Sequence, residues 1–328
     1  MSEIEFQNIE SNGITLRLAT QGEGPLVIFC HGWPESWYSY RHQLPIVADA
    51  GYKAVTYDVR GYGESDKPHE ISEYTMKKLT GDVIGIIDAL GYEEAITIGH
   101  DWGGPIALNT AALYPDRIRA TGTMSVPYMG RGPMPLLSLW KEIYKDRFFY
   151  QLYFQNEGVA ENEFEEDLQR SLRMIYSNSD GRGMKNALEK MQGGLNPEKG
   201  PDASFLEGME DYEDLPEWLS QNDLDYFISQ FEIGGMRGPI NRYRAQNQDW
   251  EELADLPDQI KQPAFFIVGN LDPTNFFVPS AEPLVKRISP NYKNLLIVEE
   301  LEGIGHWTQQ EAPDQVNNLI SEFLSKID

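Results

Sequence analysis

The chain has 328 residues, 41% of them hydrophobic and 12% aromatic, so it is long enough to bury a large core as one big domain or two smaller ones. Its 27 basic and 52 acidic residues give a formal net charge of −25, which disfavours nucleic acid and anionic membranes as partners because both would be repelled. The single cysteine, Cys30, excludes an internal disulfide, the N-terminal residues do not resemble a signal peptide, and no apolar run is long enough to span a membrane. We therefore expect a cytoplasmic protein that is not inserted into a membrane.

Short apolar runs alternate with helix-like segments along the first part of the chain. Strands are expected at 14–20, 25–30, 52–59, 94–99 and 119–126, and helices at 75–89 and 104–114. Strand-like runs return at 263–269 and 294–300, and a last helix is expected at 311–326. This alternation predicts an α/β fold with a mostly parallel sheet that is flanked by helices on both faces.

The pattern changes between residues 129 and 250. Here the segments are helix-like and rich in Tyr, Phe, Met, Glu and Asp, without comparable strand runs. Because strands resume afterwards, a helical insertion into the α/β domain explains this segment better than a separate C-terminal domain. We predict a core made of residues 1–128 and 251–328 and a helical cap domain made of residues 129–250.

The stretch GHDWGG, residues 99–104, stands between a predicted strand and a predicted helix. A strand, then small-x-nucleophile-x-small-small, then a helix is the arrangement of a nucleophile elbow, in which glycines permit a tight turn and close helix packing. The usual nucleophile is serine, whereas here the position holds Asp101. An aspartate at this place is also a common helix N-cap, so the motif needs support from elsewhere in the chain.

Two later residues supply that support. Asp272 in VGNLDPTN and His306 in EGIGHWTQQEAP each follow a predicted strand, and nucleophile, acid, histidine is the chain order of an α/β-hydrolase. Asp272 also has a structural explanation, because an acid is frequent in a turn before proline. A conventional esterase would need a serine in place of Asp101, but Ser65 and Ser125 lie outside an elbow pattern.

The core motifs HGWPESWYSYR (31–41), YDVRGYGESDKP (57–68) and GHDWGG resemble those of the epoxide hydrolases of the α/β-hydrolase fold. The similarity continues in FFYQLYFQNEGVAENEFEEDL (148–168) and GGMRGPINRYRAQNQDW (234–250), which resemble the lid segments of soluble epoxide hydrolases. It therefore extends over nearly the whole chain, and the lid segments make it more specific than the core alone.

An epoxide has an electrophilic carbon and a leaving oxygen that stays tethered, so its opening needs a nucleophile and an acid. Attack by a serine would leave a stable ether, whereas attack by the carboxylate of Asp101 leaves an ester that water can cleave. The resemblance implies one catalytic tyrosine in each lid segment, Tyr150 and Tyr243, and a phenol with a pKa near 10 is protonated at neutral pH. The neighbours Phe148, Phe149, Leu152 and Phe154 are consistent with an apolar or aryl substrate.

The second step of such a reaction needs a base and an oxyanion site. Neutral His306, oriented by Asp272, would take a proton from the water that attacks the ester. By resemblance, the backbone N–H groups of Trp33 and Trp102 would hold the resulting oxyanion.

Two other functions stay open at this point. A haloalkane dehalogenase would use the same aspartate, histidine and acid, with halide donors in place of the tyrosines. Trp102 could serve as a halide donor. Position 33, however, holds Trp33 where many dehalogenases of this fold have Asn or Glu. A non-catalytic small-molecule-binding protein of the same fold is the other, although an intact triad argues against it.

The sequence has no evident metal cluster or phosphate loop, so we expect no cofactor and no metal. The expected partners are an epoxide and water, in a monomer or a homodimer.

Overall fold

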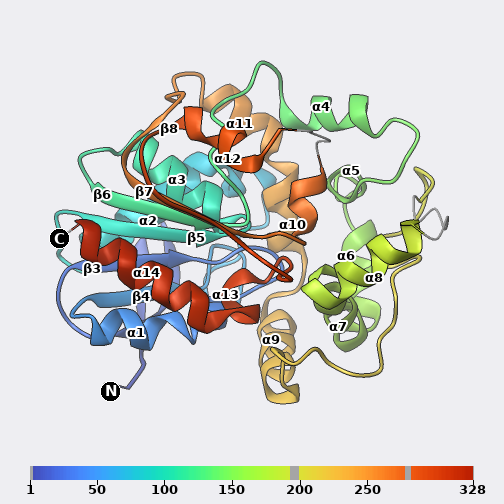
Figure 1. The fold of residues 1–328 in the computed structure, drawn as a ribbon, viewed down its shortest axis with the longest axis horizontal. Coiled ribbons are helices and arrows are strands. Elements are labelled where there is room, and N and C mark those ends of the chain that lie inside the picture. The colour runs from blue at the N-terminus through green and yellow to red at the C-terminus, as the bar shows by residue number, and fades with distance from the viewer. Residues whose placement is uncertain (1–2, 193–198, 278–281, 328) are drawn as a thin grey trace.

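The computed structural model describes residues 3–192, 199–277 and 282–327. Within these ranges, eight strands form one sheet in the order β1-β2-β4-β3-β5-β6-β7-β8 (Figure 1). The strands are β1 (Glu5–Ser11), β2 (Ile14–Gln21), β3 (Leu26–Cys30), β4 (Lys53–Tyr57), β5 (Ala95–His100), β6 (Ile118–Met124), β7 (Ile260–Gly269) and β8 (Tyr292–Leu301). The pairs β1–β2 and β2–β4 are antiparallel and the other neighbours are parallel, which confirms the mostly parallel sheet.

All seven strands expected from the sequence are present, and β1 is the one that the sequence reading missed. Its residues, EFQNIES, are mostly exposed and polar, because β1 is the antiparallel edge of the sheet and pairs only with β2. An exposed edge strand does not need the apolar residues by which buried strands are recognised.

Helices cover both faces of the sheet. The helices of the α/β part are η1 (Trp37–Tyr40), α1 (Gln43–Asp49), η2 (Ile71–Tyr74), α2 (Met76–Ala89), α3 (Gly103–Leu113), η3 (Pro273–Phe276), α12 (Leu284–Ile288), η4 (Ser289–Asn291), α13 (Thr308–Glu311) and α14 (Pro313–Ile327). The predicted helices 75–89 and 104–114 correspond to α2 and α3, and the predicted helix 311–326 corresponds to α14.

Alternate residues of β3 belong to two separate parts of the core. Val27 and Phe29 pack with α1 and α14, whereas Ile28 and Cys30 pack with α2 and α3. Neighbouring residues of a strand point to opposite faces, so a strand that is apolar throughout must be covered on both sides. Cys30 is fully buried, as expected of a small apolar residue.

The segment between β6 and β7 contains helices and, among its described residues, no strand. We call these the inserted helices: α4 (Leu136–Ile143), α5 (Tyr150–Tyr153), α6 (Val159–Glu166), α7 (Leu168–Ser179), α8 (Gly181–Gln192), α9 (Gln221–Gly234), α10 (Arg237–Arg244) and α11 (Gln246–Glu252). Helices α5 to α9 lie to the right of and below the sheet in Figure 1. The division into a core and a cap at residues 129 and 250 stays a prediction, and its second boundary falls inside α11.

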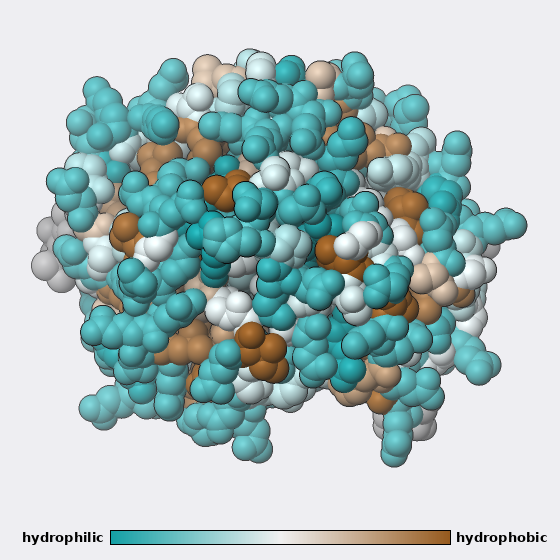
Figure 2. Space-filling model, turned by 180° about the vertical axis from the view of Figure 1, so that it is seen from behind, coloured by the Kyte–Doolittle hydropathy of each residue, from teal (hydrophilic) through white to brown (hydrophobic). Residues whose placement is uncertain are grey.

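Figure 2 shows a face that is mostly hydrophilic, with separate small hydrophobic areas. In the described part of the chain, no helix has both the length and the apolar character that crossing a membrane requires.

The contact between α3 and β3 yields the first prediction. A Cβ added to Gly103 would lie 1.7 Å from the backbone oxygen of Cys30, so Gly103→Ala must push α3 away from the sheet. We expect the free energy of unfolding to fall by about 2 kcal/mol or more, measured by urea denaturation. Gly200→Ala is the control, because a Cβ at Gly200 meets no atom within 4 Å and its stability should match the wild type. An equal effect of both substitutions would contradict the prediction.

Candidate active site

The predicted nucleophile lies on the turn between β5 and α3. Asp101 has a φ of +49°, in the left-handed region that residues other than glycine rarely adopt, and the residue is 8% exposed. The parallel strands β3, β5, β6, β7 and β8 are neighbours in the sheet, so their carboxyl ends meet at one edge. The turn therefore places the Asp101 carboxylate at the carboxyl-terminal edge of the sheet, near the loops that follow these strands.

Two groups contact the carboxylate of Asp101. The backbone N–H of Trp33, which follows β3, donates a hydrogen bond of 2.8 Å to Oδ1. The Nε2 atom of His306, which follows β8, lies 3.6 Å from Oδ2. Trp102, the other oxyanion donor implied by the resemblance, is the next residue of the chain, and its role stays a prediction.

Asp272, which follows β7, lies behind the histidine. Both of its carboxylate oxygens are 3.2 Å from Nδ1 of His306, and its side chain is fully buried. The backbone N–H and the hydroxyl of Thr274 donate to Oδ1 of Asp272, at 2.8 and 2.7 Å. The sequence-predicted acid, histidine and nucleophile are thus in contact, in the order expected of a triad.

Opposing effects set the pKa values of this cluster. Burial alone would lower the pKa of His306, but Asp272 and Asp101 outweigh it and hold that pKa well above the ordinary value. Burial alone would raise the pKa of Asp272, but His306 and the hydrogen bonds to the carboxylate keep it below the ordinary value. The two carboxylates therefore favour the imidazolium form of His306.

Ser125 is a neighbour of this cluster that the sequence reading did not place here. It follows β6, is 1% exposed and has a φ of +73°, and its Oγ lies 3.2 Å from Nδ1 of His306. The sequence alone shows only that Ser125 ends a strand, because its contact partner is 181 positions further along the chain.

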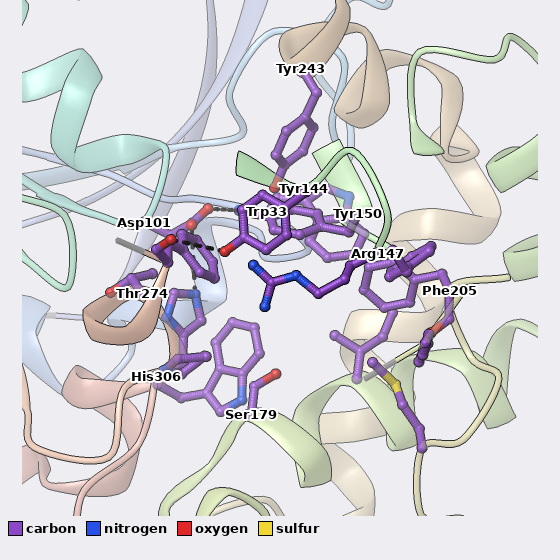
Figure 3. A pocket seen from close by; sticks show the side chains of 17 residues that line it. Trp33, Asp101, Tyr144, Arg147, Tyr150, Ser179, Phe205, Tyr243, Thr274 and His306 are labelled. Atoms are coloured by element: carbon purple, nitrogen blue, oxygen red, sulfur yellow. Dashed lines mark hydrogen bonds and ion pairs between the residues drawn. The ribbon is translucent and has the colours of Figure 1, made fainter. Parts of the chain in front are cut away.

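The two predicted tyrosines reach the same cavity from the inserted helices. The cavity has a volume of about 340 Å³, within the range of roughly 300–1,000 Å³ that is usual for small-molecule sites. It is lined by Trp33, Asp101, Tyr144, Arg147, Phe148, Tyr150, Ile175, Ser179, Lys199, Phe205, Met209, Tyr243, Pro273, Thr274, Phe277, His306 and Trp307. Figure 3 shows the rings of Tyr150 and Tyr243 pointing into the space in front of Asp101.

Both phenols are protonated at neutral pH. Burial raises the pKa of Tyr150 and of Tyr243, and the charge on Asp101 raises both further. Their ring centroids are 5.6 Å apart, and the side-chain amide of Gln151 donates to the Tyr150 hydroxyl at 3.0 Å. Two hydrogen-bond donors therefore face one carboxylate across the cavity.

Of the four apolar residues near Tyr150 that the sequence singles out, only one lines the cavity. Phe148 lines the cavity, whereas Phe149, Leu152 and Phe154 do not. Phe149 stacks against Tyr144 at 4.2 Å, and Phe154 is fully buried. Phe149 and Leu152 belong to a small hydrophobic cluster with Leu137 and Trp140 of α4, so they stabilise the packing of the inserted helices.

A buried acid and a second histidine lie behind the site. Glu35 accepts hydrogen bonds from the backbone N–H of Gly32 at 2.7 Å and from the Gln309 side chain at 2.9 Å, and it contacts Nδ1 of His100 at 2.9 Å. The Nε2 atom of His100 is 2.7 Å from the backbone oxygen of His306, so this nitrogen carries a hydrogen. His100 therefore points away from the cavity and stabilises the loop of His306.

Metal binding is not suggested by these residues. In the ranges that the structure covers, no three His, Cys, Asp or Glu side chains are grouped so as to hold a metal ion. The expectation that no metal or cofactor is needed stays a prediction.

The chain is similar to known proteins over nearly its whole length. The alpha/beta hydrolase fold family matches residues 25–313. Epoxide hydrolase A of Mycobacterium tuberculosis is 38% identical over 323 residues, covering 98% of this chain and 97% of its own, and epoxide hydrolase 2 of Siraitia grosvenorii is 34% identical over 334 residues, covering 99% and 100%. The solved structure of an epoxide hydrolase from an endophytic Streptomyces superimposes with a TM-score of 0.89 at 39% identity, covering 98% of this chain and 95% of its own.

The second prediction concerns the charge balance at His306. Asp101→Asn removes one of the two carboxylates that favour the imidazolium, so we expect the pKa of His306 to fall by about one unit or more. The measurement is an NMR titration of the His306 ring, with the surface residue His69 as the internal reference. An unchanged titration of His306 would contradict the assignment of Asp101 as its partner.

Proposed function

This chain belongs to the epoxide hydrolases of the α/β-hydrolase fold family, and we propose that it converts epoxides to vicinal diols through an ester on Asp101. The observation that supports this most directly is the placement of two protonated phenols opposite a carboxylate that contacts a histidine. A carboxylate attacks saturated carbon, and the phenols donate protons to the oxygen that leaves. The aromatic lining favours an apolar or aryl epoxide of modest size.

In the first step, an Oδ atom of Asp101 attacks one ring carbon and the bond from that carbon to the epoxide oxygen breaks. The new alkoxide takes a proton from Tyr150 or Tyr243, and the product is a hydroxyalkyl ester of Asp101. The ester carries no charge, so one of the two groups that favour the imidazolium of His306 is lost. The imidazolium releases its proton while the tyrosinate regains one, and the number of protons in the site is conserved.

In the second step, neutral His306 takes a proton from a water molecule that attacks the carbonyl carbon of the ester. The backbone N–H of Trp33, which bonds Asp101 in the free enzyme, is placed to hold the oxyanion, and we assign the N–H of Trp102 as the second donor. When the tetrahedral intermediate collapses, the bond between the carbonyl carbon and the alkyl oxygen breaks, and the imidazolium protonates the departing alkoxide. The protonated carboxyl group of Asp101 then gives its proton to His306, which restores the starting ion pair of Asp101 and His306.

Three further parts of the proposal come from the sequence. Residues 129–250 act as a cap that brings the tyrosines to the core, the protein works in the cytoplasm, and the reaction needs no cofactor. The oligomeric state stays open between a monomer and a homodimer.

The third prediction tests the nucleophile and the substrate class together. His306→Gln removes the base of the second step, so the ester on Asp101 should accumulate when the variant is incubated with an aryl epoxide. Mass spectrometry should find a mass increase equal to the intact epoxide on the peptide that contains Asp101. Asp101→Asn/His306→Gln is the control and should gain no mass. An adduct formed only from a bromoalkane, with loss of bromide, would instead indicate a dehalogenase, and no adduct from either would favour a binding protein.

The fourth prediction tests the two phenols. Tyr150→Phe/Tyr243→Phe removes both proton donors, so the rate of ester formation should fall by about 100-fold or more in a rapid-quench measurement. Tyr153→Phe is the matched control on α5, because its hydroxyl bonds the Glu163 carboxylate at 2.7 Å and the residue does not line the cavity. Ring opening at the wild-type rate in the double variant would refute the role of the tyrosines.

A further inference from the structure

Three consecutive backbone N–H groups of the His306 loop are bonded to acceptors outside residues 305–307. The N–H of Gly305 and the N–H of Trp307 donate to Oε2 and Oε1 of Glu311, at 3.0 and 2.9 Å. The N–H of His306 itself donates to the backbone oxygen of Ser179, at the end of α7, at 2.8 Å. The two oxygens of one carboxylate thus hold the residues on either side of the histidine.

The same carboxylate also reaches the inserted helices. The N–H of Gly181, the first residue of α8, donates to Oε2 of Glu311 at 2.9 Å. The backbones meet directly at this point, because a Cβ on Gly305 would lie 2.3 Å from the carbonyl carbon of Asp180. Glu311 therefore joins the loop of His306 to the start of α8 through three N–H groups and two oxygen atoms.

We propose that Glu311 is a positioning residue for His306, which fixes the imidazole at the distance that hydrolysis of the Asp101 ester requires. This inference rests on the proposed function. Ester formation uses the carboxylate of Asp101 and the two phenols, so it does not need a precisely placed base. Ester hydrolysis does, because His306 must take a proton from water within hydrogen-bond reach.

The chemistry of the contact requires a carboxylate. Both oxygens of Glu311 accept, whereas the side-chain nitrogen of a glutamine is a donor and would face an N–H group. Glu311→Gln therefore loses the bond to Trp307, or the bonds to Gly181 and Gly305, while the volume of the side chain is kept. Burial raises the pKa of Glu311 to about 7, and the three N–H donors favour its charged form.

The experiment follows the two steps separately. Wild type and Glu311→Gln are mixed with an aryl epoxide in a rapid-quench instrument, and mass spectrometry measures the ester over time. We expect ester formation to stay within about threefold of wild type and ester hydrolysis to slow by about 10- to 100-fold, so that the ester accumulates. A residue with only a structural role would slow both steps alike.

The matched control is Asp180→Asn. Asp180 is a buried carboxylate at the same junction, and it accepts from the N–H of Gly183 at 2.7 Å and from the Trp218 indole at 3.3 Å. None of these bonds involves residues 305–307, so both steps should keep nearly their wild-type rates. A selective slowing of hydrolysis in Asp180→Asn as large as in Glu311→Gln would overturn the proposal.

A second variant covers the case in which Glu311→Gln does not fold, as judged by circular dichroism. Glu311→Asp keeps the charge but is one methylene shorter, so we expect a smaller slowing that is still confined to hydrolysis. Equal slowing of both steps, or no slowing, in the variant that folds would overturn the role of Glu311. The proposed function is tested independently, since the ester trapped with His306→Gln forms on a chain with an intact Glu311.

Discussion

The site depends on one steric constraint, the close approach of the turn after β5 to the end of β3. A Cβ on Gly103 would overlap the backbone oxygen of Cys30, and a Cβ on Gly32 would lie 2.4 Å from the Cβ of Asp101. Because both positions lack a side chain, the two segments meet directly, and Asp101 adopts a left-handed φ. The same approach brings the N–H of Trp33 to the Asp101 carboxylate, so the proposed nucleophile and the proposed oxyanion donor are positioned by one contact.

The charge on Asp101 links the groups that exchange protons. In the free site it raises the pKa of His306 and also the pKa of Tyr150 and Tyr243. In the proposed first step the carboxylate becomes an ester and this charge disappears, so the phenols would become stronger acids when an alkoxide needs a proton. The imidazolium becomes a stronger acid as well, and after it loses its proton it is available as a base. In the proposed mechanism, one change of charge thus prepares both steps.

Local patterns identify the members of the proposed triad but not their surroundings. Asp101, Asp272 and His306 each follow a strand, and such positions can be found by reading along the chain. The tyrosines are identified only through the resemblance, because nothing local separates them from the other phenols among 17 tyrosines. Contacts such as those of Ser125 and Glu311 join segments more than 100 positions apart, and no pattern within one segment encodes them. The fold is more predictable, since the central strands are apolar, and the one strand not predicted, β1, is a mostly exposed and polar edge strand.

The inserted helices and the sheet meet at Trp33, which has two roles. Its backbone N–H bonds Asp101, while its indole packs edge-on against Phe154, Phe205 and Tyr243 at centroid distances of 5.3 to 5.9 Å. The aromatic ring that anchors the inserted helices is therefore attached to the peptide that holds the nucleophile. Since Tyr243 belongs to this cluster, displacement of the inserted helices would move an acid away from Asp101 and loosen the oxyanion donor together. The proposed nucleophile, the proposed acid Tyr243 and the proposed oxyanion donor are thus connected through Trp33, although they come from distant parts of the chain.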